Sequence, residues 1–172
     1  MIYKLDKIKL ITHYNNDDME LLIASINKEG SQLGRLPLYT PKTNDAQNLI
    51  FAIMFNAGGK EERLIGRVSL ENICHINQSA ELKIFISDEH VKKGFAFDAC
   101  KKVIEHGFNE LNLQRIEAGT LSNNEGFKKL AEKLGMIEEG IRRKAVWKSG
   151  EFLSVFEYGL LRSEPIETKS EV

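Results

Sequence analysis

Apolar residues recur along this chain with two different periods, and the change from one to the other marks its most informative stretch. Residues 79–87 alternate between apolar and polar, and this period of two predicts a strand with one buried face. Between positions 96 and 111 the apolar residues return at helical spacing and form one stripe: Ala96, Ala99, Cys100, Val103, Ile104, Phe108 and Leu111. The sequence therefore predicts a strand followed by an amphipathic helix, with Gly94 between them.

The rest of the chain gives a mixed order of elements. Further strands are expected over 7–15, 48–55, 63–73, 113–122, 136–147 and 151–161. Further helices are expected over 15–30 and 122–135. Ser122 and Glu125 have the spacing of a capping box, Gly135 suits the end of the second of these helices, and residues 31–47 are expected to form a long loop. The fold class is therefore α/β (α+β), a mixed sheet with helices on its faces.

Length and composition limit the kind of protein this can be. With 172 residues, 42% hydrophobic and 28% charged, the chain is predicted to form one domain over residues 1–163, with a polar tail over 164–172. The formal net charge of -1 gives no general attraction to nucleic acid or to an acidic membrane, so we predict neither as a partner. No apolar run reaches the roughly 18 residues of a membrane span, and the first residues lack a signal-peptide core.

Residues that bind metals or form disulfides are few and scattered. Two cysteines occur, Cys74 and Cys100, and the histidines at positions 13, 75, 90 and 106 share no ligand spacing. We therefore predict no metal site, reduced thiols and a cytoplasmic location. Cys100 lies on the apolar helical stripe, which indicates a core residue and not a nucleophile.

The start of the helix after Gly94 has the features of an anion site. A helix N-terminus presents unpaired backbone N–H groups and the positive end of the helix dipole. Gly94 lets a ligand approach the main chain closely, and Lys92 and Lys93 add positive charge beside it. Together these features suit a phosphate. The alternative is a plain turn with solvated lysines, since the P-loop and dinucleotide-binding glycine patterns are both missing.

Four stretches together resemble the GNAT superfamily of acyl-CoA N-acyltransferases. They are LIGRVSLENICHINQSAELKIFIS, VKKGFAFDA, NNEGFKKLAEKLGMIEEG and the hairpin KSGEF, which fall between Leu64 and Leu161. The sequence is most similar to the branch that contains ribosomal-protein N-terminal acetyltransferases and spermidine acetyltransferases. This resemblance implies a GNAT-like mixed, splayed central sheet of about seven strands flanked by helices on both faces. It also implies acetyl-CoA as cosubstrate, with its pantetheine in the gap between two parallel strands.

The resemblance assigns coenzyme contacts to particular positions. The family's pyrophosphate loop has Gln or Arg, two variable residues, Gly, one variable residue, and Gly or Ala. Gly94 and Ala96 match this pattern, Val91 departs from it, and Phe97 stands where close relatives often have a small hydroxyl residue. The implied phosphate-binding residues are Val91, Lys92, Lys93, Gly94, Phe95, Ala96 and Phe97. The implied pantetheine contacts are the main chain of Ile84, Phe85 and Ile86 and the side chain of Asn124, for which a plain helix cap is the alternative.

Acetyl transfer to an amine requires a polarised thioester carbonyl and a group that accepts the ammonium proton. Three side chains that serve as acids or bases in members of this family are replaced here by Phe127, Ala131 and Val146. Glu81 is the candidate base, because it lies on the polar face of its strand and matches an Ala-Glu pair of the relatives. The alternative is that Glu81 pairs with a lysine or arginine on a neighbouring strand. Glu71 and His75 are further candidates for the base, because they could lie near the same end of the predicted gap, although each alone is more typical of a surface residue.

The predicted function is an acetyl-CoA-dependent N-acetyltransferase that acts by direct attack of a primary amine on the thioester. The acceptor would be a protein N-terminus, a polyamine, an amino sugar or another small amine. The rivals are a non-catalytic acyl-CoA-binding module or sensor, and an interaction domain without a ligand. Trp147 and Phe152 flank the last hairpin turn and indicate either core packing or the surface of a homodimer, while residues 142–144 form a basic rim.

Overall fold

The computed structural model describes residues 1–12, 45–56, 62–164 and 166. The expected helix over 15–30, most of the expected loop over 31–47 and most of the polar tail lie outside the described residues. The strands are β1 (Ile2–Lys4), β2 (Ile8–Ile11), β3 (Leu49–Phe55), β4 (Arg63–Cys74), β5 (Ser79–Ile86), β6 (Arg115–Leu121), β7 (Ile137–Lys148) and β8 (Glu151–Leu161). The helices are the short 3₁₀ helix η1 (Asp88–His90), α2 (Phe95–Asn109) and α3 (Glu125–Lys133).

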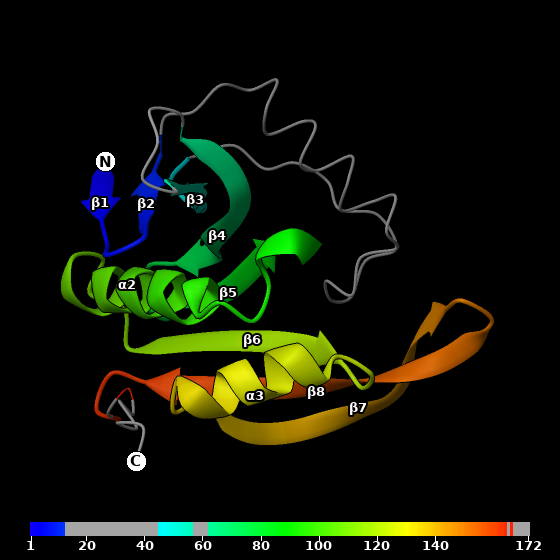
Figure 1. Cartoon of the computed structure of the whole chain (residues 1–172). Helices are drawn as coiled ribbons and strands as arrows, with labels where there is room; N and C mark the ends of the chain where they lie inside the picture. Colours follow the sequence, from blue (N-terminus) through cyan, green and yellow to red (C-terminus); the bar gives the residue numbers. More distant parts are fainter. Residues whose placement is uncertain (13–44, 57–61, 165, 167–172) are drawn as a thin grey trace, which may run out of the picture.

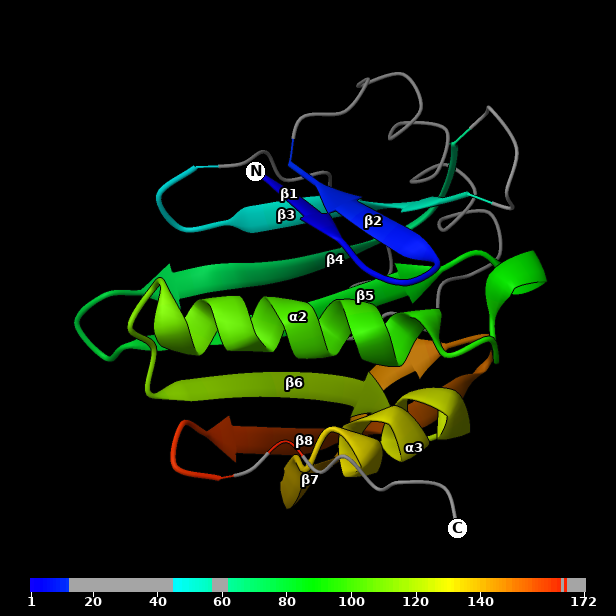
Figure 2. The same cartoon turned by 60° about the vertical axis from the view of Figure 1, so that its left-hand side comes forward.

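The eight strands of the described chain form one sheet in the order β1-β2-β3-β4-β5-β6-β8-β7 (Figure 1). Neighbouring strands are antiparallel except β5 and β6, which are parallel. Both α2 and α3 lie on one face of the sheet (Figures 1 and 2). The predicted mixed α/β sheet is confirmed, with eight strands among the described residues; helices on both faces stay a prediction, since the helix expected over 15–30 lies outside those residues. The strand that the sequence did not indicate is β1, because its three residues are too few to show a period.

The helix α2 covers the middle of the sheet because its predicted apolar stripe is buried there. Ala99, Cys100, Val103 and Ile104 are all fully buried. A Cβ atom at Gly107 would lie 2.9 Å from Leu70 Cδ1 of β4, so this glycine lets the helix approach the sheet closely. Cys100 is therefore a core residue, as predicted. Burial raises the pKa of its thiol well above the usual value and keeps it protonated.

The helix α3 begins two residues later than the predicted capping box implies. Its N-cap is Asn124, whose Oδ1 accepts a hydrogen bond of 3.1 Å from the backbone N–H of Phe127. The predicted box from Ser122 to Glu125 is therefore wrong, because the asparagine satisfies the same kind of unpaired helix N–H two positions further on. The predicted end is confirmed, since Gly135 follows the helix with a positive φ of 78°.

The strands β5 and β6 pair over a short distance and then separate. Their parallel register joins Ser79, Ala80 and Glu81 to Arg115, Ile116 and Glu117. Beyond Glu81, β5 continues to Ile86 beside β4 alone, and β6 continues to Leu121 beside β8 alone. Figure 2 shows the two strands diverging from this point toward the start of α2. The splayed sheet that the resemblance implies is thus present.

The hairpin of β7 and β8 extends beyond the rest of the sheet (Figure 1). At its tip Trp147 lies opposite Phe152, with ring centroids 4.8 Å apart, and the two residues are 60% and 58% exposed. Core packing is therefore the wrong interpretation for this pair. Val146 points to the other side of the hairpin and packs against Leu121, Leu153 and Val155, because neighbouring residues of a strand face opposite ways.

Gly66 of β4 is a position where the fold requires the absence of a side chain. A Cβ atom there would lie 3.1 Å from Ile86 Cα and closer still to the Phe85 carbonyl oxygen. We expect Gly66→Ala to lower the free energy of unfolding by about 1–3 kcal/mol, since backbone has to move to relieve the overlap. Urea denaturation measures the change. Gly140→Ala is the control, because a Cβ atom at that glycine meets nothing within 4 Å, and an equal loss in both variants would contradict the packing argument.

The buried His106 of α2 predicts a dependence of stability on pH. Its Nδ1 lies 2.7 Å from the Tyr3 hydroxyl, and burial lowers the pKa of its imidazole, with Glu110 opposing and Lys102 reinforcing the shift. The folded state therefore disfavours the charged form. We expect stability to be full above about pH 6.5 and to fall as the pH drops from there through the lower pKa of the folded state.

Urea denaturation between pH 5 and 7.5 tests this prediction. The slope should be at most about 1.4 kcal/mol per pH unit for one proton, and His106→Gln should remove it. His75→Gln is the control, because His75 is exposed. A slope that persists in His106→Gln would show that another group takes up the proton.

Candidate functional site

The loop before α2 leaves open space beside its main chain at Gly94. Gly94 is the N-cap of α2, with a φ of 85° and no side-chain hydrogen bond to the first turn. A Cβ atom built at Gly94 would meet nothing within 4 Å, so the space beside the helix start is free in the described chain. Phe95 is buried and packs against Phe55 of β3 at 5.2 Å between centroids, which anchors the loop to the core. This open helix start is compatible with the predicted phosphate contacts to backbone N–H groups.

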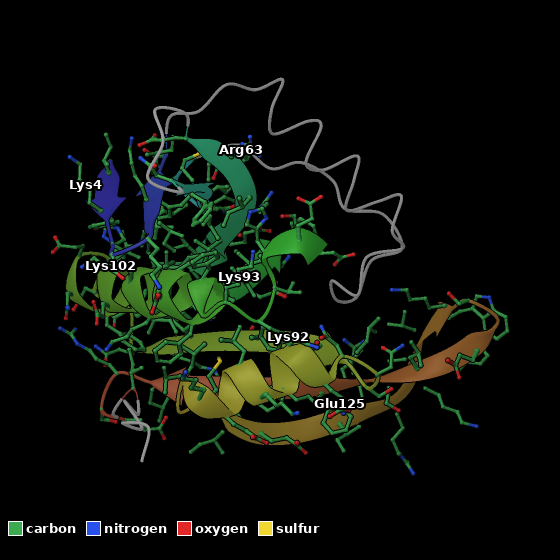
Figure 3. The ribbon with its side chains drawn as sticks, in the orientation of Figure 1. Lys4, Arg63, Lys92, Lys93, Lys102 and Glu125 are labelled. Atoms are coloured by element: carbon green, nitrogen blue, oxygen red, sulfur yellow. The ribbon has the colours of Figure 1, made fainter. Side chains whose placement is uncertain are left out.

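The predicted loop residues surround this helix start. Val91, Lys92 and Lys93 are exposed, and Lys92 has a positive φ of 60°. Figure 3 shows Lys92 and Lys93 beside the start of α2, and Glu125 at the start of α3. Phe97 lies partly buried within the first turn, and the Lys133 ammonium sits 4.6 Å from the centre of its ring. The local charge and the open backbone fit a diphosphate, and these contacts remain predictions.

The residues predicted to contact pantetheine lie on β5 beyond the point where it pairs with β6. Ile84, Phe85 and Ile86 belong to the part of β5 that pairs with β4 and has separated from β6, so that edge of the strand faces the gap. Unpaired strand edges expose N–H and C=O groups that can bind an extended ligand containing amides. Asn124 stands at the start of α3, where its Oδ1 serves as the helix cap, and its amide nitrogen is the group left for a ligand.

The face of β4 that points away from α2 carries a buried polar row. Arg67, Ser69 and Glu71 alternate along the strand and are each at most 3% exposed. Glu71 Oε1 accepts hydrogen bonds from Arg67 at 2.6 Å and from Ser69 at 2.8 Å. Glu71 Oε2 accepts one from Lys83 of β5 at 3.1 Å. Both carboxylate oxygens are thus occupied.

This pairing bears on the choice among the candidate bases. Burial would raise the pKa of Glu71, but Lys83, Arg67 and the Ser69 hydroxyl together lower it below its usual value. Glu71 is therefore held as a buried anion whose two oxygens both already accept hydrogen bonds, which disfavours it as the base, and the expectation that it would lie at the surface is wrong. His75 is exposed, and its Nε2 lies 3.3 Å from the Ala46 carbonyl oxygen.

Glu81 lies at the point where the gap opens. It is opposite Glu71 on β4 and opposite Glu117 on β6, and it belongs to the last residue pair that joins β5 to β6. Its Oε2 accepts a hydrogen bond of 2.9 Å from Asn72 and lies 3.5 Å from Lys83 Nζ. The cation beside Glu81 is therefore on its own strand, two residues away, and the alternative of a partner on a neighbouring strand does not hold for this contact.

The sequence did not predict the network that surrounds Glu81. The sequence-based predictions gave no role to Arg67, Ser69 or Lys83, although the pattern of polar residues along these strands pointed to one. Polar residues at alternate positions of an otherwise apolar strand indicate a face that is polar yet covered. The three positions that lack the family's usual acid or base are apolar in the structure as well: Ala131 and Val146 pack in hydrophobic clusters, and Phe127 packs against Tyr158.

Within the described parts of the chain, no group of three His, Cys, Asp or Glu side chains is placed to hold a metal ion. No helix among the described residues has the length and apolar character that crossing a bilayer requires.

Comparison with known proteins shows which family this chain belongs to. Residues 8–137 match the family described as the acetyltransferase (GNAT) domain, which is more than half of the chain. The chain belongs to the GNAT acetyltransferase family. It is 34% identical over 101 residues to a putative ribosomal N-acetyltransferase of Bacillus subtilis, a match that covers 59% of this chain and 55% of that protein. The chain thus spans about half the length of the curated relatives it matches.

Solved GNAT structures share the fold over most of the chain. A crystal structure of a probable acetyltransferase superposes with a TM-score of 0.79 at 24% identity, covering 95% of this chain and 98% of that one. Spermidine N-acetyltransferase of Vibrio cholerae, solved in complex with CoA and spermine, superposes with a TM-score of 0.64 at 25% identity, covering 88% and 78%. GNAT acetyltransferases use acetyl-CoA, which agrees with the coenzyme that the loop and the gap were predicted to bind.

Proposed function

We propose that this protein is an acetyl-CoA-dependent N-acetyltransferase that transfers an acetyl group to a primary amine. The observation that carries the proposal is the separation of β5 from β6 after Glu81, which opens a gap beside the helix start at Gly94. The predicted phosphate loop, the edge of β5 beyond Glu81 and the Glu81 carboxylate would then lie along one path. That order matches a coenzyme with a diphosphate, an arm containing amides and a reactive thioester.

The chemistry assigned to this path is a direct transfer. The amine nitrogen attacks the thioester carbonyl, the C–N bond forms, and the C–S bond breaks. Glu81 takes the proton that the ammonium loses, directly or through one water. The thiolate of CoA leaves and takes up a proton from solvent, because apolar side chains occupy the positions where relatives carry an acid. Holding the two substrates together supplies a large part of the rate.

The acceptor is proposed from two kinds of relative. One is named for a ribosomal substrate, and another was solved with spermine, so a protein N-terminus and a polyamine are the first amines to consider. An amino sugar or another small amine belongs to the same chemical class.

Thiol release from acetyl-CoA across a panel of amines tests the proposal. The panel contains spermidine, spermine, glucosamine, and short peptides with free and blocked N-termini. We expect release above the hydrolysis background for at least one free amine, and none for the blocked peptide. Tight acetyl-CoA binding with no release for any amine would instead indicate a binding module, and a melting temperature unmoved by millimolar CoA would contradict coenzyme binding itself.

We also propose that the protein works in the cytoplasm as a homodimer or larger homo-oligomer. The free thiols of Cys74 and Cys100 suit a reducing compartment. The exposed pair of Trp147 and Phe152 supports self-association, since paired aromatic side chains at a surface are typical of interfaces. Sedimentation velocity of the protein and of Trp147→Ser tests this point, and a monomer at micromolar concentration in both would contradict it.

A further inference from the structure

The strand β4 is irregular at the point where it passes Glu81. Its register with β5 shifts between Glu71 and Cys74, and Asn72 within the shift has a positive φ of 54°. Regular alternation would place the Asn72 side chain on the face of Leu70, which lies under α2. The bulge turns it instead to the polar face, where its amide reaches Glu81. Asparagine suits this position because it adopts the left-handed conformation more readily than most residues.

Glu81 is held through one of its two oxygens. Asn72 Nδ2 donates the shorter contact to Oε2, at 2.9 Å, and the Lys83 ammonium provides the longer one, at 3.5 Å. Lys83 is itself fixed by the buried Glu71 at 3.1 Å. Among the described residues both contacts fall on Oε2, which leaves Oε1 for an approaching amine. A glutamate has three side-chain torsions, so fixing one oxygen restricts the directions in which the other can point.

We propose that Asn72 is a positioning residue that directs Oε1 of Glu81 toward the acceptor amine. The inference rests on the proposed function, in which Glu81 accepts the proton. Without the amide, the longer contact to Lys83 alone would hold the carboxylate. Glu81 would then present Oε1 to the amine in a smaller share of encounters, and a displacement near 1 Å is enough to slow a proton transfer markedly.

Asn72→Gly is the sharpest test, because glycine readily adopts the positive φ and removes the side-chain amide. With the amine that gives the fastest thiol release in the panel, we expect kcat to fall roughly tenfold. Acetyl-CoA affinity measured by calorimetry should stay unchanged. Gln78→Gly is the matched control, because Gln78 has a similar φ of 49°, lies in the turn between β4 and β5, and makes no side-chain hydrogen bond among the described residues.

The double variant Asn72→Gly/Glu81→Gln shows whether Asn72 acts through Glu81. If it does, the double variant is as slow as Glu81→Gln and no slower. A multiplied loss in the double variant would overturn the positioning role, and so would a normal rate in Asn72→Gly while Glu81→Gln is slow. That second result leaves the proposed base in place. A normal rate in Glu81→Gln would instead remove the base, and the role of Asn72 with it.

Discussion

Glu81→Gln is expected to slow acetyl transfer by ~10²-fold, in the lower range for loss of a general base. The glutamine keeps the shape of the side chain and loses its basicity. Acetyl-CoA affinity should hardly change, because Glu81 lies at the apex of the gap and the phosphate loop lies around Gly94. The measurement is the pH–rate profile of both proteins, and we expect the acidic limb of the original profile to be absent from the variant.

A purely structural Glu81 would give a different result. Its contacts are a hydrogen bond from Asn72 and an ion pair with Lys83, and a partly exposed pair of this kind contributes about 1 kcal/mol or less. In that case stability would drop slightly while turnover persisted with an unshifted acidic limb. Glu62→Gln is the control for a carboxylate in a surface ion pair, since Glu62 pairs with Lys9 away from the gap. If Glu81→Gln transfers acetyl groups as fast as the control Glu62→Gln, Glu81 is not part of the mechanism.

The fold follows from the sequence where a period is long enough to be read. The alternation over 79–87 became β5, and the apolar stripe from Ala96 to Leu111 became the buried side of α2. β1 was not predicted because three residues are too few to show a period. The predicted start of α3 was wrong because Ser122 and Asn124 can both cap a helix. The local sequence does not decide between these two candidate caps.

The site was less predictable than the fold because its geometry is set by pairing between strands. That Glu81 belongs to the last pair between β5 and β6 follows from where two strands separate, which depends on packing across the whole sheet. The same holds for Glu71. Its sequence position suggested a surface residue, but its neighbours across the sheet are Arg67, Ser69 and Lys83, and together they stabilise a buried anion.

The bulge at Asn72 shows most clearly what the sequence alone does not predict. A strict alternation from Leu70 onward places Asn72 under α2, and its contact with Glu81 exists because the backbone breaks that alternation. The sequence contains one hint, since asparagine is common at positive φ, but asparagine is also common in ordinary turns. Bulges arise from the competition between two strands for register, which no single stretch of sequence displays.

Gly94→Val is expected to weaken acetyl-CoA binding by about 10- to 100-fold. Gly94 has a φ of 85°, which a β-branched residue strongly disfavours, so the loop would move to a new conformation. The free space beside Gly94 is where the phosphates are expected to lie, and the valine methyl groups would enter it. Charge-assisted hydrogen bonds from the helix start would be lost, and Lys92 and Lys93 would be displaced with the loop.

Gly150→Val separates this effect from backbone strain. Gly150 has a φ of 87° and equally open space for a Cβ atom, but it lies in the β7–β8 turn, away from the helix start. Both variants should lose similar stability in urea, since each forces a β-branched residue into the same region of φ. Calorimetry with acetyl-CoA should then show a loss for Gly94→Val alone. Unchanged affinity in a folded Gly94→Val protein would exclude this loop as the phosphate site and leave the gap between β5 and β6 as the remaining coenzyme contact.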